Sequence, residues 1–315
     1  MMLGFIGLGV MGAPMCRNLA AKSREEVRAY DADLDTLAQM DQAGVIPVES
    51  IREVAERADV VFLALPGGPQ VQAVCLGAGS LLTHMRPGTC VVDLSTVPVN
   101  MARDLEARFA ARGIQFADAP VARTRAAARE GTLLAMVGAS DAVFARVKPL
   151  LEHMASDIVH CGGPGTGQAM KLVNNMVLFQ NVVALAEAFA LIRHAKVEPA
   201  RALAILSKGS ADSFALRNHG MKAMLPGQYP ERAFSSEYAL KDIRYALRFA
   251  EEAGLFLSGA DNAKEVIKRA IRAGFAKEYF PALAKVITPA AKAGAPTGPA
   301  RPVAAGKPAP KKRGA

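Results

Sequence analysis

The feature that most constrains the fold is a glycine-rich turn near the N-terminus. An apolar run over residues 3–6 leads into Gly7-Leu8-Gly9-Val10-Met11-Gly12, and a helical pattern follows over 11–21. In a Gly-x-Gly-x-x-Gly turn between a strand and a helix, two glycines let the backbone turn and approach a pyrophosphate, and the third lets the helix pack closely. The helix N-terminus also favours an anion. The motif therefore predicts a dinucleotide site that includes Gly7, Gly9, Val10, Met11 and Gly12.

The end of the next predicted strand indicates which dinucleotide binds. Asp31 follows the run over 27–30 and lies 19 residues after Gly12. A carboxylate at this spacing binds the ribose hydroxyls of NAD and repels the additional phosphate of NADP. Ala32 and Asp33 follow, with no arginine between them. We predict NAD rather than NADP, the alternative being a glycine-rich turn and a surface aspartate with no cofactor role.

Apolar runs typical of strands alternate with helical patterns up to about residue 161. The predicted strands are 3–6, 27–30, 60–65, 90–94, 115–117 and 133–137, and the predicted helices between them are 11–21, 34–43, 99–112 and 141–151. This alternation predicts an α/β fold with a Rossmann-type, doubly wound and mostly parallel sheet.

Beyond the glycine-rich segment 162–167 the pattern is helical only. The predicted helices are 168–194, 199–208, 238–252 and 261–273. From 288 onward alanine, proline, glycine and lysine dominate, a composition that cannot bury a core. We therefore predict an NAD-binding Rossmann domain over 1–165, an all-helical domain for substrate binding and oligomerisation over 166–287, and a disordered basic tail over 288–315.

The net charge is +9, from 38 Lys and Arg against 29 Asp and Glu, and by itself it invites a nucleic-acid or acidic-membrane interpretation. Segment 288–315 holds six basic residues and no acidic one, which leaves +3 for residues 1–287. The charge therefore does not indicate a nucleic-acid-binding fold. A scaffold that binds nucleic acid through its basic tail remains an alternative from a different functional class.

The cysteine spacing and the apolar segments also indicate the cellular compartment. The cysteines at 16, 75, 90 and 161 have neither zinc-site nor disulfide-framework spacing, so we predict no metal and a reducing compartment. No Lys or Arg precedes Arg17, which argues against a signal peptide. The apolar run over 172–192 contains three asparagines, a glutamine and a glutamate, which is too polar for a plain membrane span. We expect a soluble cytoplasmic protein with no membrane partner.

Several short segments together resemble one enzyme family. They are the glycine loop, Asp93-Leu94-Ser95-Thr96, Asp118-Ala119-Pro120-Val121, Gly131-Thr132-Leu133, the glycine-rich segment 162–167, Lys171-Leu172-Val173-Asn174-Asn175 and Lys241-Asp242. In this order, over residues 1–287, the chain resembles the β-hydroxyacid dehydrogenases of the 3-hydroxyisobutyrate dehydrogenase-like family. Taken alone, Ser95 and Thr96 are equally compatible with capping the helix predicted from 99.

The resemblance implies roles for particular residues. Lys171 matches the catalytic general acid and base, and Asn175 the residue that helps orient the substrate, with Asn174 beside it. Thr96 should lie near the nicotinamide end of the cofactor, and Lys241 should close over the site from the helical domain. Leu65 and Pro66, at the end of a predicted strand, match a backbone contact to the cofactor.

The residues themselves support part of this assignment. Lys171 and Asn175 are four positions apart on a predicted helix and share a face that Leu178 and Val182 continue. A lysine desolvated on such a face would have its pKa lowered toward neutrality, which suits proton transfer to or from a substrate oxygen. Without the resemblance, a solvated surface lysine is the better interpretation.

One departure from the family pattern concerns the substrate. Relatives follow Asp-Ala-Pro-Val with Ser-Gly-Gly, whereas this chain has Ala122-Arg123-Thr124. A guanidinium fork suits a bidentate oxyanion such as a sulfonate or carboxylate. Arg123 and Thr124 resemble the sulfolactaldehyde reductase branch of the family, although that branch usually has Gly at position 122. The alternative is that Arg123 belongs to a solvated basic face with Arg125 and Arg129.

These observations predict an NAD-dependent oxidoreductase that interconverts a short 3-hydroxy acid, or its sulfonate analogue, and the corresponding aldehyde. Arg123, Thr124, Asn174 and Asn175 would bind the small anionic substrate. Alternatives within the class are 3-hydroxyisobutyrate dehydrogenase and tartronate semialdehyde reductase, which the absence of Ser-Gly-Gly disfavours. The family resemblance also implies a homo-oligomer.

Overall fold

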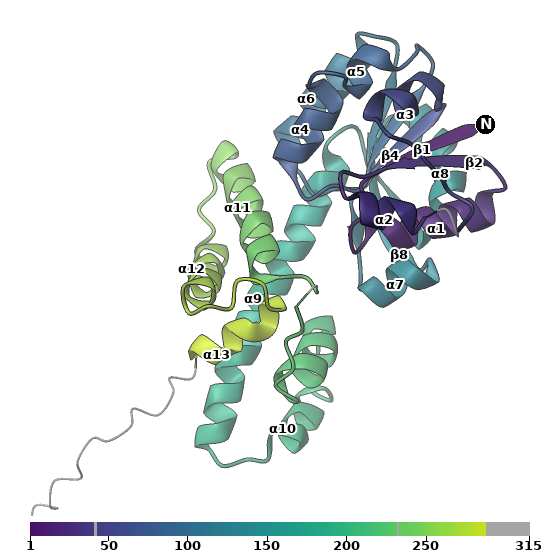
Figure 1. Cartoon of the computed structure of the whole chain (residues 1–315). Helices are drawn as coiled ribbons and strands as arrows, with labels where there is room; N and C mark the ends of the chain where they lie inside the picture. Colours follow the sequence, from purple (N-terminus) through teal and green to yellow (C-terminus); the bar gives the residue numbers. More distant parts are fainter. Residues whose placement is uncertain (41–42, 232, 288–315) are drawn as a thin grey trace, which may run out of the picture.

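The computed structural model describes residues 1–40, 43–231 and 233–287, and the predicted tail over 288–315 lies outside them. A mixed sheet covered by helices occupies the first half of the chain, and a helical C-terminal domain follows it (Figure 1). This is the Rossmann-type α/β architecture with an all-helical second domain that the sequence predicts.

The sheet has the strand order β3-β2-β1-β4-β5-β6-β8-β7, with β9 paired to β8. The first six strands are parallel, and β8 runs antiparallel to β6 and β7. Since the order reverses beside β1, the carboxyl ends of β1 and β4 form the crevice where such sheets bind ligands. The strands are β1 Met2–Ile6, β2 Glu26–Tyr30, β3 Ile46–Pro47, β4 Val60–Leu63, β5 Cys90–Asp93, β6 Gln115–Asp118, β7 Val121–Ala122, β8 Leu133–Gly138 and β9 Ala155–Gly162.

Continuous apolar strands are buried on both faces. Phe5 and Phe62 stack on one face of the sheet with ring centroids 6.1 Å apart, while Ile6 and Leu63 pack into the core on the other. A strand with both faces buried gains hydrophobic stabilisation from every side chain, which is why these runs show no alternation. The covering helices are α1 Gly12–Ser23, α2 Leu34–Ala38, α3 Ile51–Arg57, α4 Gly68–Leu76, α5 Leu81–His84, α6 Val99–Ala110, α7 Arg125–Glu130 and α8 Asp141–Leu151.

The helical domain is assembled around α9, Thr166–His194. Phe179 on α9 packs edge-to-face on Phe280, and the core around them is apolar. By length and composition α9 could cross a membrane, but α11 and α12 pack against it, as expected for the core helix of a soluble domain. The remaining elements are α10 Pro199–Leu206, the π-helix η2 Leu216–Met224, α11 Ser236–Glu252, α12 Ser258–Arg272, the 3-10 helix η3 Phe280–Leu283 and α13 Ala284–Ile287.

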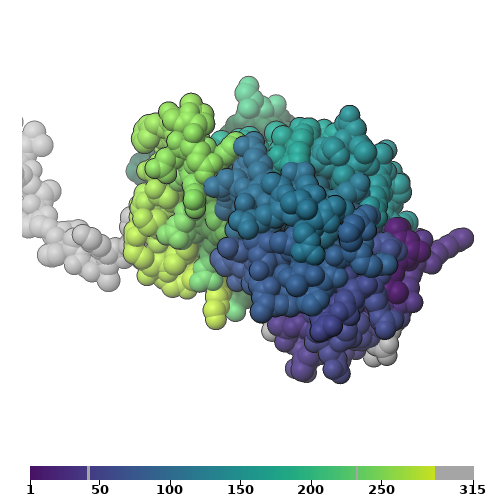
Figure 2. Space-filling model, turned by 90° about the horizontal axis from the view of Figure 1, so that it is seen from above, coloured from purple at the N-terminus to yellow at the C-terminus, as the bar shows by residue number. Residues whose placement is uncertain are grey.

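Helix α9 begins at the edge of the sheet and continues into the second domain. Leu172 on α9 packs with Val99 on α6 and Ala246 on α11, so the two halves share a small apolar contact. Asn100 donates a hydrogen bond to Glu252 at 3.2 Å beside this contact. Figure 2 shows the blue surface of the sheet domain against the green surface of the helical domain. Residues of α4, α6 and α11 line a hollow of about 420 Å³.

The structure differs from the predicted elements in several places. The helix predicted over 34–43 ends at Ala38, and residues 41 and 42 lie outside the described part of the chain. The strand predicted over 60–65 ends at Leu63, which leaves Leu65 and Pro66 in the loop after it. Strand β9 was missed because most of its residues are exposed or half-buried and include Ser156, Asp157 and His160. The other elements that sequence reasoning missed are β3, β7, α3, α4, α5, α7, η2, η3 and α13.

Candidate active site

The glycine turn joins β1 to α1, and its three glycines have different surroundings. Gly7 has a φ of 98°, and a Cβ there would lie 2.5 Å from the Ala64 carbonyl oxygen. A Cβ at Gly12 would overlap the Gly7 carbonyl oxygen, so Gly12 allows α1 to begin directly against the turn. A Cβ at Gly9 would have no neighbour within 4 Å, which leaves its backbone open to a ligand. The turn therefore has the features that the pyrophosphate motif requires.

The N-terminus of α1 is available to an anion. Met11 precedes the helix without a side-chain cap, and the first turn carries no acidic residue. Val10 is exposed at the tip of the turn. Asp31 lies directly after β2, where its Oδ2 accepts a hydrogen bond from the Leu8 backbone N–H. The predicted ribose-binding carboxylate is thus adjacent to the predicted pyrophosphate site, as the parallel pairing of β1 and β2 requires.

The loops after β4 and β5 are tied together at the same edge of the sheet. The Leu65 N–H donates to Ser95 Oγ at 2.9 Å, and the Ser95 N–H donates to Asp93 Oδ1 at 2.9 Å. Burial raises the pKa of Asp93 to about 6. Thr96 follows and is half-buried, whereas Pro66 is exposed. Hence Leu65, Pro66 and Thr96 lie on connected loops beside the crevice.

Asp118, which sequence reasoning quoted only as part of a motif, anchors the start of α9. Its Oδ1 accepts a hydrogen bond from the Gly165 N–H and its Oδ2 from the Gln168 N–H, each at 2.7 Å. Burial raises the pKa of Asp118 to about 6. Two otherwise unpaired N–H groups at the beginning of a helix are thereby satisfied by a residue from β6. The Asp118 carboxylate holds the first turn of α9 against the sheet.

Lys171 lies buried on α9, with 9% of its surface exposed, next to Asn175. The Asn175 Nδ2 donates to Asp242 Oδ2 at 2.7 Å, and the Asn174 Nδ2 donates to Asn175 Oδ1 at 3.0 Å. Desolvation lowers the pKa of Lys171 to about 8; the negative charge of Asp242 opposes the shift, and Lys241 adds a smaller lowering. The solvated-surface alternative for Lys171 is therefore wrong, because the ammonium is withdrawn from water.

Lys241 on α11 reaches across to the sheet domain. Its Nζ donates to the Thr96 carbonyl oxygen at 3.1 Å and lies 3.1 Å from Asp242 Oδ1. The Tyr245 ring lies below the ammonium at 5.3 Å, and the Gly68 N–H donates to the Tyr245 hydroxyl at 3.4 Å. Asp242 and Tyr245 have no role in the sequence prediction. The adjacent Lys-Asp pair is the one signal that indicates Asp242, while nothing local distinguishes Tyr245.

The hydrogen bonds that Arg123 makes within the described part of the chain lie at the β8–β9 edge and not with Lys171, Asn175 or Lys241. Arg123 has a φ of 88°, and its guanidinium donates to the Thr132 carbonyl oxygen at 2.6 Å, to Ser156 Oγ at 2.8 Å and to Asp157 Oδ2 at 2.6 Å. Thr124 Oγ1 accepts a hydrogen bond from the Ala127 N–H and caps α7. Arg123 is exposed and paired with Asp157 at the β8–β9 edge, an arrangement closer to the surface alternative than to an unpaired anion-binding fork.

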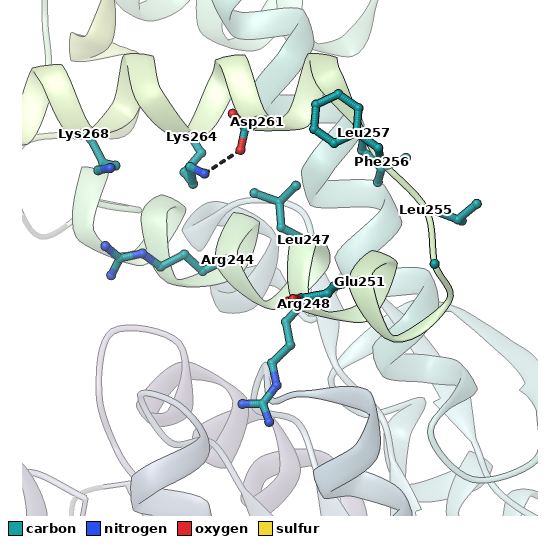
Figure 3. A pocket seen from close by; sticks show the side chains of 11 residues that line it. Arg244, Leu247, Arg248, Glu251, Leu255, Phe256, Leu257, Asp261, Lys264 and Lys268 are labelled. Carbon is teal, nitrogen blue, oxygen red and sulfur yellow. Dashed lines mark hydrogen bonds and ion pairs between the residues drawn. The ribbon is translucent and has the colours of Figure 1, made fainter.

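A separate hollow of about 780 Å³ lies between α11 and α12 (Figure 3). Lys264 pairs with Asp261 there, and Arg248 points toward the sheet domain. Among the described residues that line this hollow none is a predicted site residue. No group of three or more His, Cys, Asp or Glu that could hold a metal occurs in the described part of the chain. The candidate site therefore consists of the crevice residues and the Lys171 cluster, which comprises Lys171, Asn175, Lys241 and Asp242.

The chain matches two family models in succession. Residues 2–163 match the NAD-binding domain of 6-phosphogluconate dehydrogenase, and residues 165–287 match the NAD-binding domain of NADP-dependent 3-hydroxyisobutyrate dehydrogenase. Together the two models cover nearly all of the described residues. The comparison thus follows the same division between sheet and helices that Figure 1 shows.

Individual relatives agree with this match. The chain is 34% identical to 2-(hydroxymethyl)glutarate dehydrogenase of Eubacterium barkeri, over 90% of this chain and 94% of that protein. It is also 34% identical to 2-hydroxy-3-oxopropionate reductase of Escherichia coli, over 84% and 90%. The structure of Mycobacterium tuberculosis 3-hydroxyisobutyrate dehydrogenase with L-serine superposes with a TM-score of 0.82 at 30% identity, over 91% and 98%. The chain belongs to the β-hydroxyacid dehydrogenase family of NAD-binding oxidoreductases that act on hydroxyl groups.

Proposed function

We propose that this protein transfers a hydride between NAD and the terminal carbon of a short anionic 3-hydroxy acid or its aldehyde. The observation that carries the proposal is the buried Lys171 ammonium, whose pKa is lowered to about 8, beside the Asn175–Asp242 pair. A general acid is most effective when its pKa lies near the working pH. The Asp242 carboxylate partly offsets the desolvation of this ammonium and keeps its pKa near neutrality.

The residues around the crevice fit the cofactor. The open Gly9 backbone and the uncapped N-terminus of α1 would hold the pyrophosphate, and Asp31 would bind the ribose hydroxyls. Thr96 and the Leu65–Pro66 backbone would lie near the nicotinamide, with Lys241 covering it from α11. When bound, NADH supplies the hydride for reduction of an aldehyde.

The chain's own residues would manage the proton and the substrate. In reduction, Lys171 would donate its proton to the carbonyl oxygen as that oxygen gains negative charge, and in oxidation it would accept the hydroxyl proton. Asn175, fixed by Asp242, would orient the substrate, with Asn174 beside it. Catalysis would then come from positioning together with a matched pKa.

Replacement of the lysine tests this assignment. Lys171→Met keeps the length of the side chain and removes the proton donor, so kcat for aldehyde reduction should fall at least about 100-fold. NADH binding, followed by nicotinamide fluorescence, should be retained. Lys264→Met on α12 is the control and should behave like the wild type. A Lys171→Met enzyme with more than about a tenth of wild-type kcat would refute the role.

The finer proposal is that the substrate is a sulfolactaldehyde-like sulfonated aldehyde, bound by Arg123. Its guanidinium fork supports the proposal, but the substrate anion must replace Asp157 as the partner. The pair is largely exposed, and such pairs are worth at most about 1 kcal/mol, so an incoming sulfonate can compete. Thr124, which caps α7 next to Arg123, would contribute beside it.

Two variants distinguish a substrate-binding arginine from a structural one. Arg123→Gly should raise KM for a sulfonated aldehyde about 10-fold or more and leave KM for an uncharged aldehyde unchanged. Asp157→Asn should lower KM for the sulfonated aldehyde up to about fivefold, because it releases the guanidinium. Equal effects of Arg123→Gly on both aldehydes would assign Arg123 to the β8–β9 edge alone.

A second candidate substrate is tartronate semialdehyde, which the similarity to the Escherichia coli 2-hydroxy-3-oxopropionate reductase favours. Methylmalonate semialdehyde, the substrate expected of a 3-hydroxyisobutyrate dehydrogenase, is the third. Steady-state oxidation of NADH with these two aldehydes, sulfolactaldehyde and succinate semialdehyde should reveal one preferred substrate. Similar kcat/KM values for all four would contradict a dedicated sulfonate site.

The proposal extends to the cellular compartment and the oligomeric state of the enzyme. We place it in the cytoplasm, because free cysteines and a small-molecule substrate suit a reducing compartment. A homo-oligomer is favoured by the exposed apolar residues of α9, which include Met170, Val173 and Val177. The buried Lys171 cluster supports an enzyme over a nucleic-acid-binding scaffold, since a scaffold has no use for it.

A further inference from the structure

Gln168 lies between the loop that carries Thr96 and the part of α9 that carries Lys171. It lies in the first turn of α9, three residues before Lys171, and its surface is completely buried. A buried side-chain amide must have its donor and acceptor satisfied, because an unpaired polar group costs about 1–3 kcal/mol. The partners of Gln168 therefore indicate what the residue is there to hold.

Both partners belong to the loop that carries Thr96. The Gln168 Nε2 donates to the Ser95 carbonyl oxygen at 2.8 Å, and its Oε1 accepts from the Val97 N–H at 3.1 Å. The amide thus pairs with the peptide groups on either side of Thr96, as a neighbouring strand would. The Thr96 carbonyl oxygen accepts from Lys241 Nζ, so the loop is held from α9 and from α11.

The backbone of Gln168 is fixed as well. Its N–H donates to the buried Asp118 carboxylate, which comes from β6. A Cβ on the preceding Gly167 would lie 2.3 Å from the Met136 carbonyl oxygen, so α9 begins in direct contact with the sheet. Gln168 is therefore a short, buried link between the sheet, the Thr96 loop and the helix that presents Lys171.

We propose that Gln168 is a positioning residue that sets the distance between the Thr96 loop, at the nicotinamide end of the cofactor, and the Lys171 ammonium. The inference rests on the proposed function and deepens it. Hydride transfer needs reacting atoms about 3–3.5 Å apart, and a displacement of about 1 Å costs about 100-fold in rate. Loss of the link should therefore affect kcat far more than cofactor affinity.

Gln168→Met tests the proposal, because it keeps the length of the side chain and removes both hydrogen bonds. We expect kcat to fall about 100-fold, the Kd for NADH to stay within about threefold, and the primary isotope effect with deuterated NADH to rise as hydride transfer becomes rate-limiting. Gln180→Met is the matched control. Gln180 lies about 18 Å farther along α9 and bonds only to the helix's own Met176 carbonyl oxygen among its described contacts.

Hydrogen exchange provides a readout that does not depend on turnover. The Val97 amide is protected by Gln168 Oε1, so Gln168→Met should speed its exchange about tenfold or more, whereas Gln180→Met should not. If Gln168→Met does not fold, Gln168→Asn replaces it, because its shorter amide cannot span both peptide groups. Unchanged exchange at Val97, or a loss of NADH affinity equal to the loss of kcat, would overturn the inference. If the wild type reduces no aldehyde in the panel, the proposed function is wrong, and the exchange experiment still decides whether Gln168 holds the loop.

Discussion

At the scale of single residues, the Lys171 ammonium is buried, where water stabilises its charge poorly. Lowering the pKa of Lys171 from 10.5 to about 8 corresponds to about 3 kcal/mol of destabilisation of the charged form. The negative charge of Asp242 limits the shift, and its Oδ2 accepts a hydrogen bond from Asn175 Nδ2. The same carboxylate therefore sets the charge state of the proposed acid and the orientation of its neighbour.

The pH dependence of the reaction follows from this pKa. Aldehyde reduction needs Lys171 protonated, so log kcat/KM should be flat below about pH 8 and fall by one unit for each pH unit above it. Oxidation needs the neutral amine, so its kcat/KM should fall below about pH 8. Asp242→Asn removes the charge that opposes the shift and should move both profiles to lower pH. Steady-state kinetics between pH 6 and 10 checks this, and profiles with no break near pH 8 would exclude Lys171 as the titrating group.

At the scale of elements, the candidate site lies where strands end and helices begin. The turn between β1 and α1, the loops after β4 and β5, and the first turns of α9 all meet at one edge of the sheet. Parallel strands bring their carboxyl ends together, and helix beginnings present unpaired N–H groups. The N–H groups of Gly165 and Gln168 at the start of α9 donate to Asp118, whereas α1 has no side-chain cap. The N-terminus of α9 is therefore paired within the protein, whereas the N-terminus of α1 is available to an anion such as the proposed pyrophosphate.

Two glycines of the turn provide a matched test. Gly9→Ala adds a methyl group with no neighbour within 4 Å, so Tm should stay within about 2 °C while NADH binding weakens about 10-fold or more. Gly12→Ala forces a methyl group into the Gly7 carbonyl oxygen and should lower Tm by about 5 °C or more. Thermal unfolding and fluorescence titration with NADH measure both effects. Unchanged NADH affinity in Gly9→Ala would show that the turn does not bind the pyrophosphate.

At the scale of the whole molecule, α9 does two things at once. One face carries the buried residues Lys171 and Asn175. Another face carries Met170, Val173 and Val177, each more than 40% exposed. These three lie at helical spacing and form a stripe rather than scattered surface residues. Exposed apolar stripes of this kind mark protein interfaces, and a second copy of the chain is the proposed partner.

Charge placed on this stripe should separate the copies. Val177→Glu should lower the apparent mass toward that of one chain, 33.2 kDa, because a carboxylate would be buried in an apolar interface. Leu255→Glu is the control, since Leu255 is 61% exposed on the loop between α11 and α12 and away from the stripe. Sedimentation velocity or light scattering gives the masses. A wild type that sediments as one chain at micromolar concentration would contradict the proposed homo-oligomer.

Much of the fold follows from local pattern. The strands around β1, the glycine turn and the helices α8 and α9 were predicted within a few residues of their observed ends, because strong hydrophobic periodicity and glycine steric requirements act locally. Short or polar elements such as β9 and α7 were missed. Their stability comes from neighbours far away in the sequence, as in the pairing of β9 with β8.

The sequence by itself determined the Rossmann-type sheet, the glycine turn with Asp31 beside it and the shared face of Lys171 and Asn175, since each depends on spacings within one or two elements. Only the tertiary structure decided that Asp242 lies against Asn175, that Gln168 hydrogen-bonds to the Thr96 loop, and that Arg123 pairs with Asp157. Those contacts join residues 34 to 73 positions apart. Burial, hydrogen-bond satisfaction and charge pairing at such separations depend on how the sheet and helices pack, and no local pattern encodes them.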